Sequence, residues 1–176
     1  MAMRLLMHAC CGPCAVYPYK VLARGHEVGM LFHNPNIHPE AEYAARLGSV
    51  RMLAESLGVP LAEVGGCDEA GWARPCGVFA DRCAYCYMVR LIRTAEYAKE
   101  NGYDAFTTSL LVSPYQRHGL IKAIGGYAHR RVGVPFLYTD YREGYRKGKA
   151  EARSMGLYMQ RHCGCVNSIG SGGAAV

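Results

Sequence analysis

The sequence lacks the features that mark membrane, secreted and disordered proteins. No apolar run approaches the roughly twenty residues of a transmembrane helix, and the first residues show no signal-peptide pattern. Pro and Gly are not in excess, no repeat or linker divides the chain, and 51% of its 176 residues are hydrophobic. We therefore expect a cytoplasmic protein without a membrane partner, with one domain over residues 1–165 and a flexible tail over residues 166–176.

Cysteine is the residue type that stands out in this chain. There are nine cysteines, an odd number that cannot pair completely within one molecule. In a reducing compartment, such a count indicates metal binding or catalysis rather than a disulfide framework. Cys10, Cys11 and Cys14 lie within five residues, directly after an apolar run of strand length. Soft metals and redox chemistry both require sulfur atoms that converge on one point.

Apolar segments of strand length alternate with segments of helical periodicity along the chain. We predict five strands, at residues 3–9, 27–33, 60–64, 105–109 and 135–139. We predict helices at residues 15–24, 39–57, 83–100, 115–131 and 143–155, and a long irregular loop at residues 65–82. This alternation is typical of an α/β protein with a single doubly wound, mostly parallel five-stranded sheet.

Ligands bind such sheets beyond the carboxyl ends of the strands, at the point where the strand order reverses. The predicted strands end at the cysteine turn, at Asn34-Pro35-Asn36-Ile37-His38, at Thr107-Thr108-Ser109 and at Asp140-Tyr141-Arg142. We therefore expect these polar clusters to meet at one edge of the sheet.

Two more cysteine groups accompany the turn. Cys83 and Cys86 are three residues apart near a predicted helix start, where the helix dipole favours thiolates, and Cys163 and Cys165 flank a glycine. The seven clustered sulfurs exceed the four that a tetrahedral zinc or a cubane iron–sulfur cluster uses. The surplus predicts a second metal, or a dithiol beside the first metal.

The spacing of these cysteines restricts the kinds of metal site that the chain is expected to form. It does not match the closely spaced run of ferredoxins, and it lacks the paired hairpin motifs of a structural zinc ribbon. A redox-active cluster is therefore favoured over structural zinc. Cys67 and Cys76 stand alone in the long loop, and we interpret both as incidental.

Several polar residues allow a functional and a structural interpretation. The stiff loop at residues 34–39 suits substrate contact, but loops of Pro and Asn are also ordinary turns. Asp140 is either a metal- or proton-handling carboxylate or a helix cap paired with Arg142.

The charged and aromatic residues also allow either a functional or a structural interpretation. The formal net charge is +6, with basic residues at Arg130-Arg131 and along residues 142–153. This pattern indicates either a nucleic-acid surface or a solvated helix face. Trp72, Tyr115 and Tyr127 are either base-stacking side chains or part of the core.

Taken in order, these motifs resemble the QueH family, the cobalamin-independent epoxyqueuosine reductases. The matching segments are Cys10-Cys11-Gly12-Pro13-Cys14, Asn34-Pro35-Asn36-Ile37-His38-Pro39 with Glu42-Tyr43, Arg82-Cys83 with Cys86, Arg90-Leu91 and Thr94-Ala95, Phe106-Thr107-Thr108-Ser109-Leu110-Leu111 with Ser113-Pro114, Asp140-Tyr141-Arg142, and Tyr158-Met159-Gln160-Arg161-His162-Cys163-Gly164-Cys165. The chain departs from the family pattern at residues 76–81, at Tyr87 in place of a usual Phe, and at His162 in place of a tyrosine.

The resemblance implies a nucleotide α-hydrolase-like (HUP-like) fold and a defined reaction. That reaction is the two-electron removal of the epoxide oxygen of epoxyqueuosine at the wobble position of tRNA, which gives queuosine and water. The resemblance further implies a 4Fe–4S cluster, a nearby second metal ion (iron or zinc), and an electron donor such as ferredoxin or flavodoxin.

The resemblance also suggests roles for individual residues. Cys11, Cys83 and Cys86 would hold most of the cluster, with Cys10 as a further cofactor-binding candidate. Cys10 and Cys14 would point toward the second metal, because adjacent Cys10 and Cys11 on an extended chain are expected to point apart. Cys163 and Cys165 would complete either metal site or form a dithiol that stores electrons. The catalytic candidates are Cys10, Cys14, Asp140, Cys163 and Cys165, and the substrate-binding candidates are Asn34, Asn36, His38, Ser109, Arg142, Arg130 and Arg131.

Two other classes of protein are compatible with the residues alone. A zinc-dependent RNA-binding module would hold zinc without iron and would accept no electrons. A thiol–disulfide oxidoreductase would work without metal, through one dithiol with a perturbed potential.

Overall fold

The computed structural model describes residues 2–73 and 81–165. Cys76, the rest of the unusual loop up to residue 80, and the predicted tail at residues 166–176 lie outside the described residues. Over the described ranges, none of the helices combines the length and the apolar character needed to cross a membrane.

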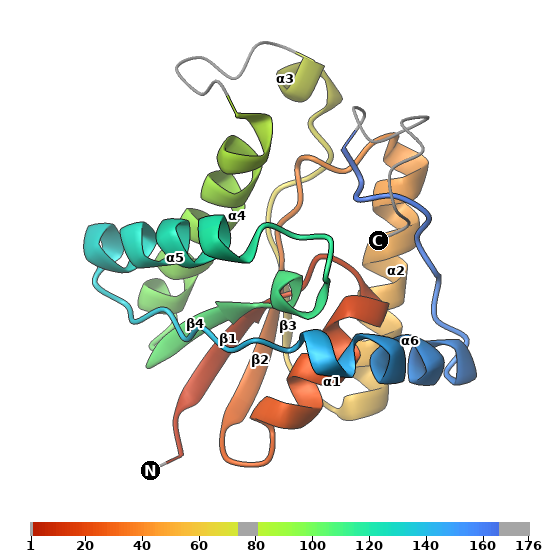
Figure 1. Cartoon of the computed structure of the whole chain (residues 1–176), viewed down its shortest axis with the longest axis horizontal. Coiled ribbons are helices and arrows are strands. Elements are labelled where there is room, and N and C mark those ends of the chain that lie inside the picture. Colours follow the sequence, from red (N-terminus) through yellow and green to blue (C-terminus); the bar gives the residue numbers. More distant parts are fainter. Residues whose placement is uncertain (1, 74–80, 166–176) are drawn as a thin grey trace.

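A parallel sheet forms the centre of the protein (Figure 1). Its strands are β1 (Arg4–His8), β2 (Glu27–Phe32), β3 (Leu61–Glu63) and β4 (Ala105–Thr108), in the order β3-β2-β1-β4. All three neighbouring pairs are parallel, with Leu6 opposite Gly29 on one side and Phe106 on the other. The doubly wound prediction is confirmed, and the strand order reverses between β1 and β4.

The predicted count of five strands is wrong, because the described residues form a four-stranded sheet. The segment predicted as the fifth strand does run beside β4. It makes one isolated bridge, between Phe106 and Phe136, with two backbone hydrogen bonds of 2.8 and 2.9 Å. Pro135 has no N–H to extend the ladder, and the segment lies at the edge of the sheet. The pairing therefore stops after one bridge.

Helices connect the strands and pack against the sheet. They are α1 (Gly12–Leu22), α2 (Glu40–Leu57), α3 (Glu69–Ala73), α4 (Arg82–Glu100), α5 (His118–Val132) and α6 (Tyr145–Ser154), with two short 3₁₀ turns, η1 (Ser109–Val112) and η2 (Arg142–Gly144). Helices α4 and α5 pack together, and α1 packs against both α2 and α6 (Figure 1). Gly12 permits the close approach of α1 to α2, because a Cβ atom there would lie 2.3 Å from Ser49 Oγ.

Several predicted helix boundaries differ from the structure. The helix predicted at residues 15–24 begins at Gly12, and the one predicted from residue 143 begins at Tyr145. The loop predicted at residues 65–82 contains the short helix α3. The helix predicted from residue 115 begins at His118, because the chain after β4 first forms η1 and a turn in which Ser113 Oγ accepts a hydrogen bond from Tyr115 N at 3.3 Å.

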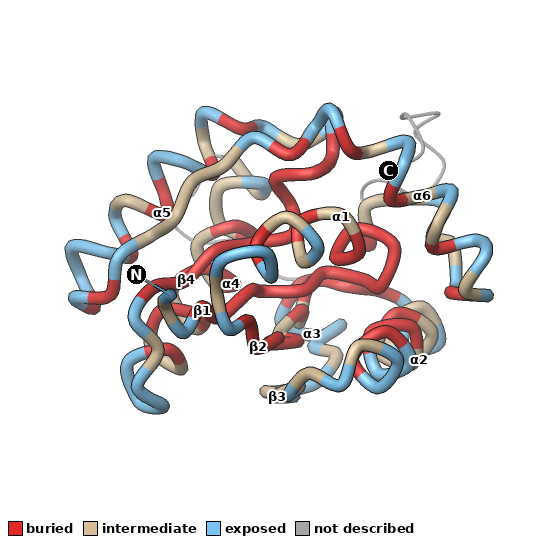
Figure 2. Tube along the Cα trace, turned by 90° about the horizontal axis from the view of Figure 1, so that it is seen from below, coloured by how far each residue is buried: buried red, intermediate tan, exposed pale blue. Residues whose placement is uncertain are grey.

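Burial is greatest along β1 and the segment that follows it (Figure 2). Leu5, Leu6 and Met7 are fully buried, as expected for a strand with neighbours on both sides and helices on both faces. The cysteine turn continues this buried segment without a break. The thiols therefore begin from the most rigid part of the molecule.

Candidate metal and redox site

The cysteine turn lies at the carboxyl end of β1, beside the carboxyl end of β4. Cys11 has extended backbone angles (φ −171°, ψ 163°) and precedes the first turn of α1, where Pro13 is favourable. The sulfur atoms of Cys10, Cys11 and Cys14 all lie within 4.8 Å of one another, and those of Cys10 and Cys11 are 3.8 Å apart. We call these three residues the thiol trio.

The prediction that Cys10 and Cys11 point apart is wrong. It assumed that the strand continues through both residues, so that successive side chains alternate. Instead β1 ends at His8, and the chain turns into α1 at Gly12, which brings both sulfurs to one side. All three thiols are buried, with exposed fractions of 6% or less.

Neighbouring polar side chains hold the thiol trio in place. Ser109 Oγ accepts a hydrogen bond from Cys10 N at 3.1 Å and donates one to Cys10 Sγ at 3.4 Å. Gln160 Nε2 donates to Cys14 Sγ at 3.3 Å. Asn34 Nδ2 donates to the carbonyl of Ala9 at 3.0 Å, which fixes the residue just before the trio. The candidates Ser109 and Asn34 thus support the turn.

The three thiols share charge unequally. Hydrogen bonds from Cys11 and Cys14 hold the pKa of Cys10 well below its usual range. Burial raises the pKa of Cys11, and the hydrogen bond with Cys10 raises the pKa of Cys14. The trio therefore favours a single thiolate, on Cys10, until a cation compensates further negative charge.

Four further cysteines lie around the same cavity, which has a volume of about 220 Å³. Cys83 and Cys86 come from the first turns of α4, where Asp81 caps the helix by accepting hydrogen bonds from Cys83 N (2.9 Å) and Ala84 N (3.2 Å). Cys163 and Cys165 come from the segment after α6. Six of the seven clustered cysteines line this cavity, and Cys11 completes the set through the trio.

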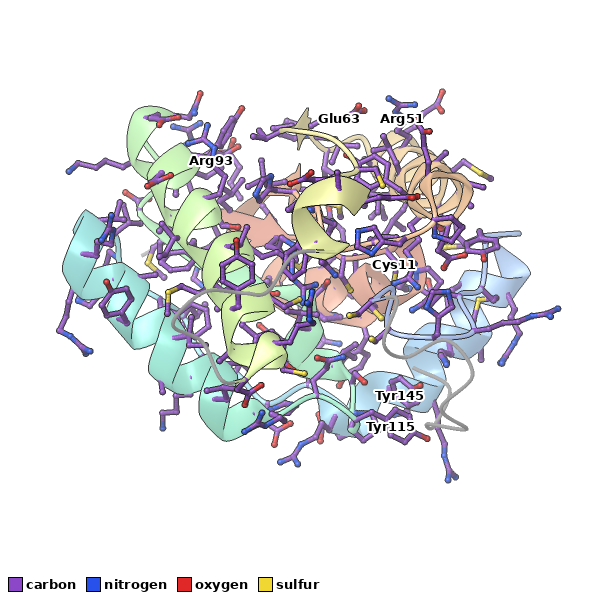
Figure 3. The ribbon with its side chains drawn as sticks, turned by 90° about the horizontal axis from the view of Figure 1, so that it is seen from above. Cys11, Arg51, Glu63, Arg93, Tyr115 and Tyr145 are labelled. Carbon is purple, nitrogen blue, oxygen red and sulfur yellow. The ribbon has the colours of Figure 1, made fainter. Side chains whose placement is uncertain are left out.

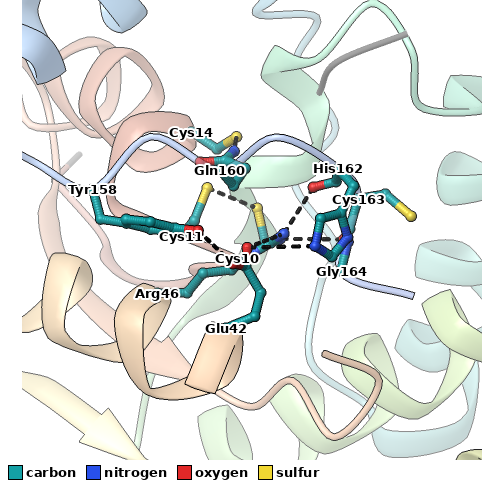
Figure 4. A network of polar contacts seen from close by, with 10 residues as sticks. All are labelled: Cys10, Cys11, Cys14, Glu42, Arg46, Tyr158, Gln160, His162, Cys163 and Gly164. Atoms are coloured by element: carbon teal, nitrogen blue, oxygen red, sulfur yellow. Dashed lines mark hydrogen bonds and ion pairs between the residues drawn. The ribbon is translucent and has the colours of Figure 1, made fainter. Parts of the chain in front are cut away.

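A buried network holds the segment that carries Cys163 and Cys165 (Figure 4). Arg46 on α2 donates hydrogen bonds to Glu42 Oε1 (2.7 Å), to the carbonyl of His162 (2.7 Å) and to the carbonyl of Cys163 (3.2 Å). The hydroxyl of Tyr158 donates to Glu42. His38 N donates to the carbonyl of Gly164 at 2.8 Å, which ties the segment to the loop after β2.

The loop after β2 contributes differently at each of its predicted residues. Asn36 lines the cavity, and its buried Oδ1 lacks a hydrogen-bond partner among the described residues. His38 is buried with an unpartnered Nε2, and its ring lies 6.5 Å from that of Trp72. Trp72 itself is 4% exposed, so of its two interpretations the core one is confirmed.

The structure does not bring Asp140 or Arg142 to the cavity. Asp140 accepts hydrogen bonds from Arg142 N (3.1 Å) and Nε (2.9 Å), and both side chains are exposed. The ion pair lowers the pKa of Asp140 to about 2. These contacts agree with the interpretation of Asp140 as a cap paired with the arginine.

Arg130 and Arg131 lie at the last turn of α5, exposed and far from the cavity. Helix α5 begins at His118, whose Nε2 lies 3.2 Å from the carbonyl of the cavity residue Ser113. At a rise of about 1.5 Å per residue, these arginines lie about 18–20 Å along the helix axis from His118. Only a large ligand reaches from the cavity to both.

Several cavity residues had no role in the sequence prediction. They are Arg46, Arg82, Tyr87, Arg90, Leu110, Ser113, Gln116 and Gln160. Arg82, Arg90, Leu110, Ser113 and Gln160 lie in the segments that match the family, and Arg90 also shares a helix face with Cys86, four residues before it. Tyr87, where the resembled family has Phe, donates a hydrogen bond to Gln116 Oε1 at 2.6 Å, a contact that Phe lacks.

The lone cysteine Cys67 is not among the cavity residues. Its sulfur donates to the carbonyl of Ile37 at 3.2 Å. That contact agrees with the interpretation of Cys67 as incidental. The second lone cysteine, Cys76, lies outside the described residues.

Comparison with known proteins identifies the relatives of this chain. A family model described as epoxyqueuosine reductase QueH matches residues 5–170. A protein of that name from Dehalococcoides mccartyi is 35% identical over 170 residues, which cover 96% of this chain and 93% of the relative. Another from Thermotoga maritima is 31% identical over 175 residues, which cover 94% and 90% of the two chains.

Solved structures with low sequence identity share the fold. The U34-tRNA thiolase NcsA from Methanococcus maripaludis, solved with its 4Fe-4S cluster, matches with a TM-score of 0.60 at 13% identity. This match covers 89% of the present chain and 58% of NcsA. A predicted tRNA methyltransferase subunit from Methanocaldococcus jannaschii matches with a TM-score of 0.53 at 13% identity, over 86% and 74% of the two chains. These matches show that the chain shares the fold of both proteins, in agreement with the predicted α/β class with a mostly parallel sheet.

Proposed function

The chain belongs to the epoxyqueuosine reductase QueH family, and from this premise we propose that it converts epoxyqueuosine in tRNA to queuosine. The reaction consumes two electrons and two protons, breaks both carbon–oxygen bonds of the epoxide, and yields a carbon–carbon double bond and water. The observation that carries the proposal is that six cysteines line one cavity where the strand order reverses, with Cys11 beside them in the thiol trio.

The distances between sulfurs support two metal groups. A tetrahedral ion with metal–sulfur bonds of about 2.3 Å has sulfur ligands about 3.8 Å apart. Cys10 Sγ and Cys11 Sγ have this spacing at 3.8 Å, and all three sulfurs of the trio lie within 4.8 Å of one another. We assign the trio to a single metal ion, iron or zinc, in place of the division between Cys10 and Cys11 expected from the sequence.

The remaining four cysteines fit the larger group. Cys83, Cys86, Cys163 and Cys165 supply the four thiolates that a 4Fe–4S cluster needs. Their sulfurs are not gathered as tightly as the trio, which is appropriate when each binds a different corner of a cluster. When bound, the cluster supplies electrons one at a time, drawn from a donor such as ferredoxin or flavodoxin.

The protein supplies acceptors for the modified nucleoside. Asn36 Oδ1 and Gln160 Oε1 are buried without hydrogen-bond partners among the described residues, and both side chains line the cavity. A buried acceptor without a partner is costly, so each is available to a hydroxyl or amine donor of the substrate.

We also propose that residues 1–165 act as one domain, since the first and last segments of this range meet at the cavity. We place the enzyme in the cytoplasm with its tRNA.

An exposed aromatic ring lies next to the cavity. Tyr115 stands between the cavity residues Ser113 and Gln116 and is 51% exposed. Its ring packs edge-on against Tyr145, with centroids 6.0 Å apart (Figure 3). Base–aromatic stacking contributes about 1–3 kcal/mol per base. We propose that Tyr115 stacks on an anticodon-loop base, while Arg130, Arg131 and Arg142 meet phosphates farther along the RNA.

The RNA contacts have a direct test. Tyr115→Ala should raise the Michaelis constant for the tRNA by about 5- to 150-fold, the equivalent of one lost stacking contact. Tyr115→Phe keeps the ring and serves as the matched control, with a Michaelis constant near that of the wild type. Equal constants for both variants would contradict a stacking role.

The first experiment for the function is anaerobic purification, followed by the visible spectrum and the iron, sulfide and zinc content per chain. About four irons with sulfide, one further metal, and bleaching on reduction support the proposal. Turnover is then measured on tRNA that carries epoxyqueuosine, by mass spectrometry of the released nucleosides. One zinc without sulfide would support an RNA-binding module, and a metal-free active dithiol would support a thiol–disulfide oxidoreductase.

A further inference from the structure

Arg90 lies on α4 and is buried beside the cysteines. It is 4% exposed and lines the cavity. Its Nη2 donates a hydrogen bond to Cys86 Sγ at 2.9 Å, and its Nε donates to the carbonyl of Cys86 at 3.3 Å. Its guanidinium also lies 5.8 Å from the ring centroid of Tyr87. These contacts place a permanent positive charge against a sulfur atom inside the protein.

The surroundings of Arg90 are unusual because they contain no carboxylate partner. Among residues 2–73 and 81–165, no Asp or Glu forms an ion pair with Arg90, and the other residues of the chain include neither Asp nor Glu. The equally buried Arg46 is paired with Glu42 at 2.7 Å. Burial of an uncompensated charge costs several kcal/mol, so Arg90 requires an anion of another kind.

The groups around Arg90 identify that anion as sulfur. Cys86 Sγ accepts its hydrogen bond at 2.9 Å. Cys10, Cys83, Cys163 and Cys165 line the same cavity as Arg90, and no carboxylate residue of the described ranges lines it.

Arg90 is thus a fixed cation without a carboxylate partner among the described residues, beside thiols that are anionic when they bind metal. Adding an electron to a cluster adds negative charge, and a nearby cation that donates a hydrogen bond to a ligand sulfur stabilises the reduced form. Resting on the proposed function, we propose that Arg90 is a positioning residue that raises the reduction potential of the cluster at Cys86, and so permits its reduction by the electron donor.

The test compares variants of two arginines on α4. Arg90→Gln removes the charge at the cavity, whereas Arg93→Gln removes the same charge three residues along, where Arg93 pairs with Glu96 and Glu100 (Figure 3). The midpoint potential of the anaerobically purified, cluster-loaded chain is measured by potentiometric titration in the visible range, without tRNA. We expect a more negative potential for Arg90→Gln and an unchanged potential for Arg93→Gln.

A conservative variant keeps the test decisive if Arg90→Gln does not fold. Arg90→Lys keeps the charge but loses the planar guanidinium that bonds both atoms of Cys86, so we expect a smaller shift in the same direction. A wild-type potential in a cluster-loaded Arg90 variant overturns the inference and leaves the proposed function standing. A wild-type chain that binds neither iron nor sulfide overturns the proposed function, and the inference with it.

Discussion

The seven clustered cysteines form two regions that are built in different ways. The thiol trio comes from one turn, and its sulfurs already lie within 4.8 Å of one another. Cys83, Cys86, Cys163 and Cys165 come from two segments about 80 residues apart in the sequence, and they line the cavity without gathering as closely. A short turn fixes the first region locally, whereas tertiary contacts assemble the second.

The supporting residues differ in the same way. The trio is held by neutral groups, Ser109 and Gln160, that bond directly to its sulfurs. The second region depends on two buried arginines, Arg90 at Cys86 and Arg46 at the Cys163 segment. Arg46 binds the carbonyls of His162 and Cys163, and Arg90 binds the sulfur of Cys86, so charged donors contact the second region where neutral donors contact the trio.

The largest expected effects come from substituting one cysteine in each of the two regions. Cys14→Ser should remove the single metal ion while sulfide stays near the wild-type level, and Cys86→Ser should remove sulfide and the visible colour. Each should lower turnover by more than about 100-fold, because each removes a ligand of a metal on which the reaction depends. Metal and sulfide content per chain is the measurement.

Cys67→Ser is the matched control, since this cysteine is not among the residues that line the cavity, and its thiol donates to the carbonyl of Ile37 and to Glu69. It should leave metal, sulfide and turnover near wild-type values. Loss of sulfide in Cys14→Ser together with full retention in Cys86→Ser would reverse the assignment of the two regions.

The next effect concerns stability. Arg46→Gln leaves Glu42 buried without its cation and frees the Cys163 segment, so the free energy of unfolding should fall by about 3–5 kcal/mol. Arg51 lies on the same helix as Arg46 and forms an exposed pair with Glu63 on β3, so Arg51→Gln should cost less than about 1 kcal/mol. Urea unfolding of both variants checks this difference, and equal costs would show that burial of the pair is unimportant.

A smaller effect is expected at the amide that contacts the trio. Gln160→Leu removes the hydrogen bond to Cys14 Sγ at nearly constant volume. Groups that support metal ligands typically contribute 10- to 100-fold in metal affinity or activity. Competition with a chelator measures the affinity of the single metal. Unchanged affinity in Gln160→Leu would mean that the contact does not support the trio.

The smallest effect separates the two interpretations of Asp140. Its pKa of about 2 lies below the value of about 3.9 expected in the unfolded chain, so the unfolded state binds more protons between these values. The stabilisation by the Asp140–Arg142 pair is therefore complete above about pH 4 and is lost as the pH falls through about 2. Because both side chains are exposed, Asp140→Asn should cost less than about 1 kcal/mol.

Turnover of the same variant tests the catalytic interpretation. The contacts of Asp140 predict that Asp140→Asn retains turnover on the tRNA. A loss of more than about 10-fold, with stability intact, would instead support the catalytic role considered from the sequence. Arg142→Gln is the companion variant, because it removes the partner of Asp140 while leaving the carboxylate in place.

The sequence by itself determined the doubly wound sheet and the position of the thiols at its edge. Apolar runs of strand length, helical periodicity and cysteine spacing are local properties that can be recognised without knowledge of the fold. Only the tertiary structure decided that Cys10 and Cys11 share one direction, because a turn replaces strand alternation after His8. Likewise, nothing in the sequence distinguishes Arg46 and Arg90 from exposed helix residues. Both are buried by packing between distant segments, and burial strengthens the electrostatic effect of their charges.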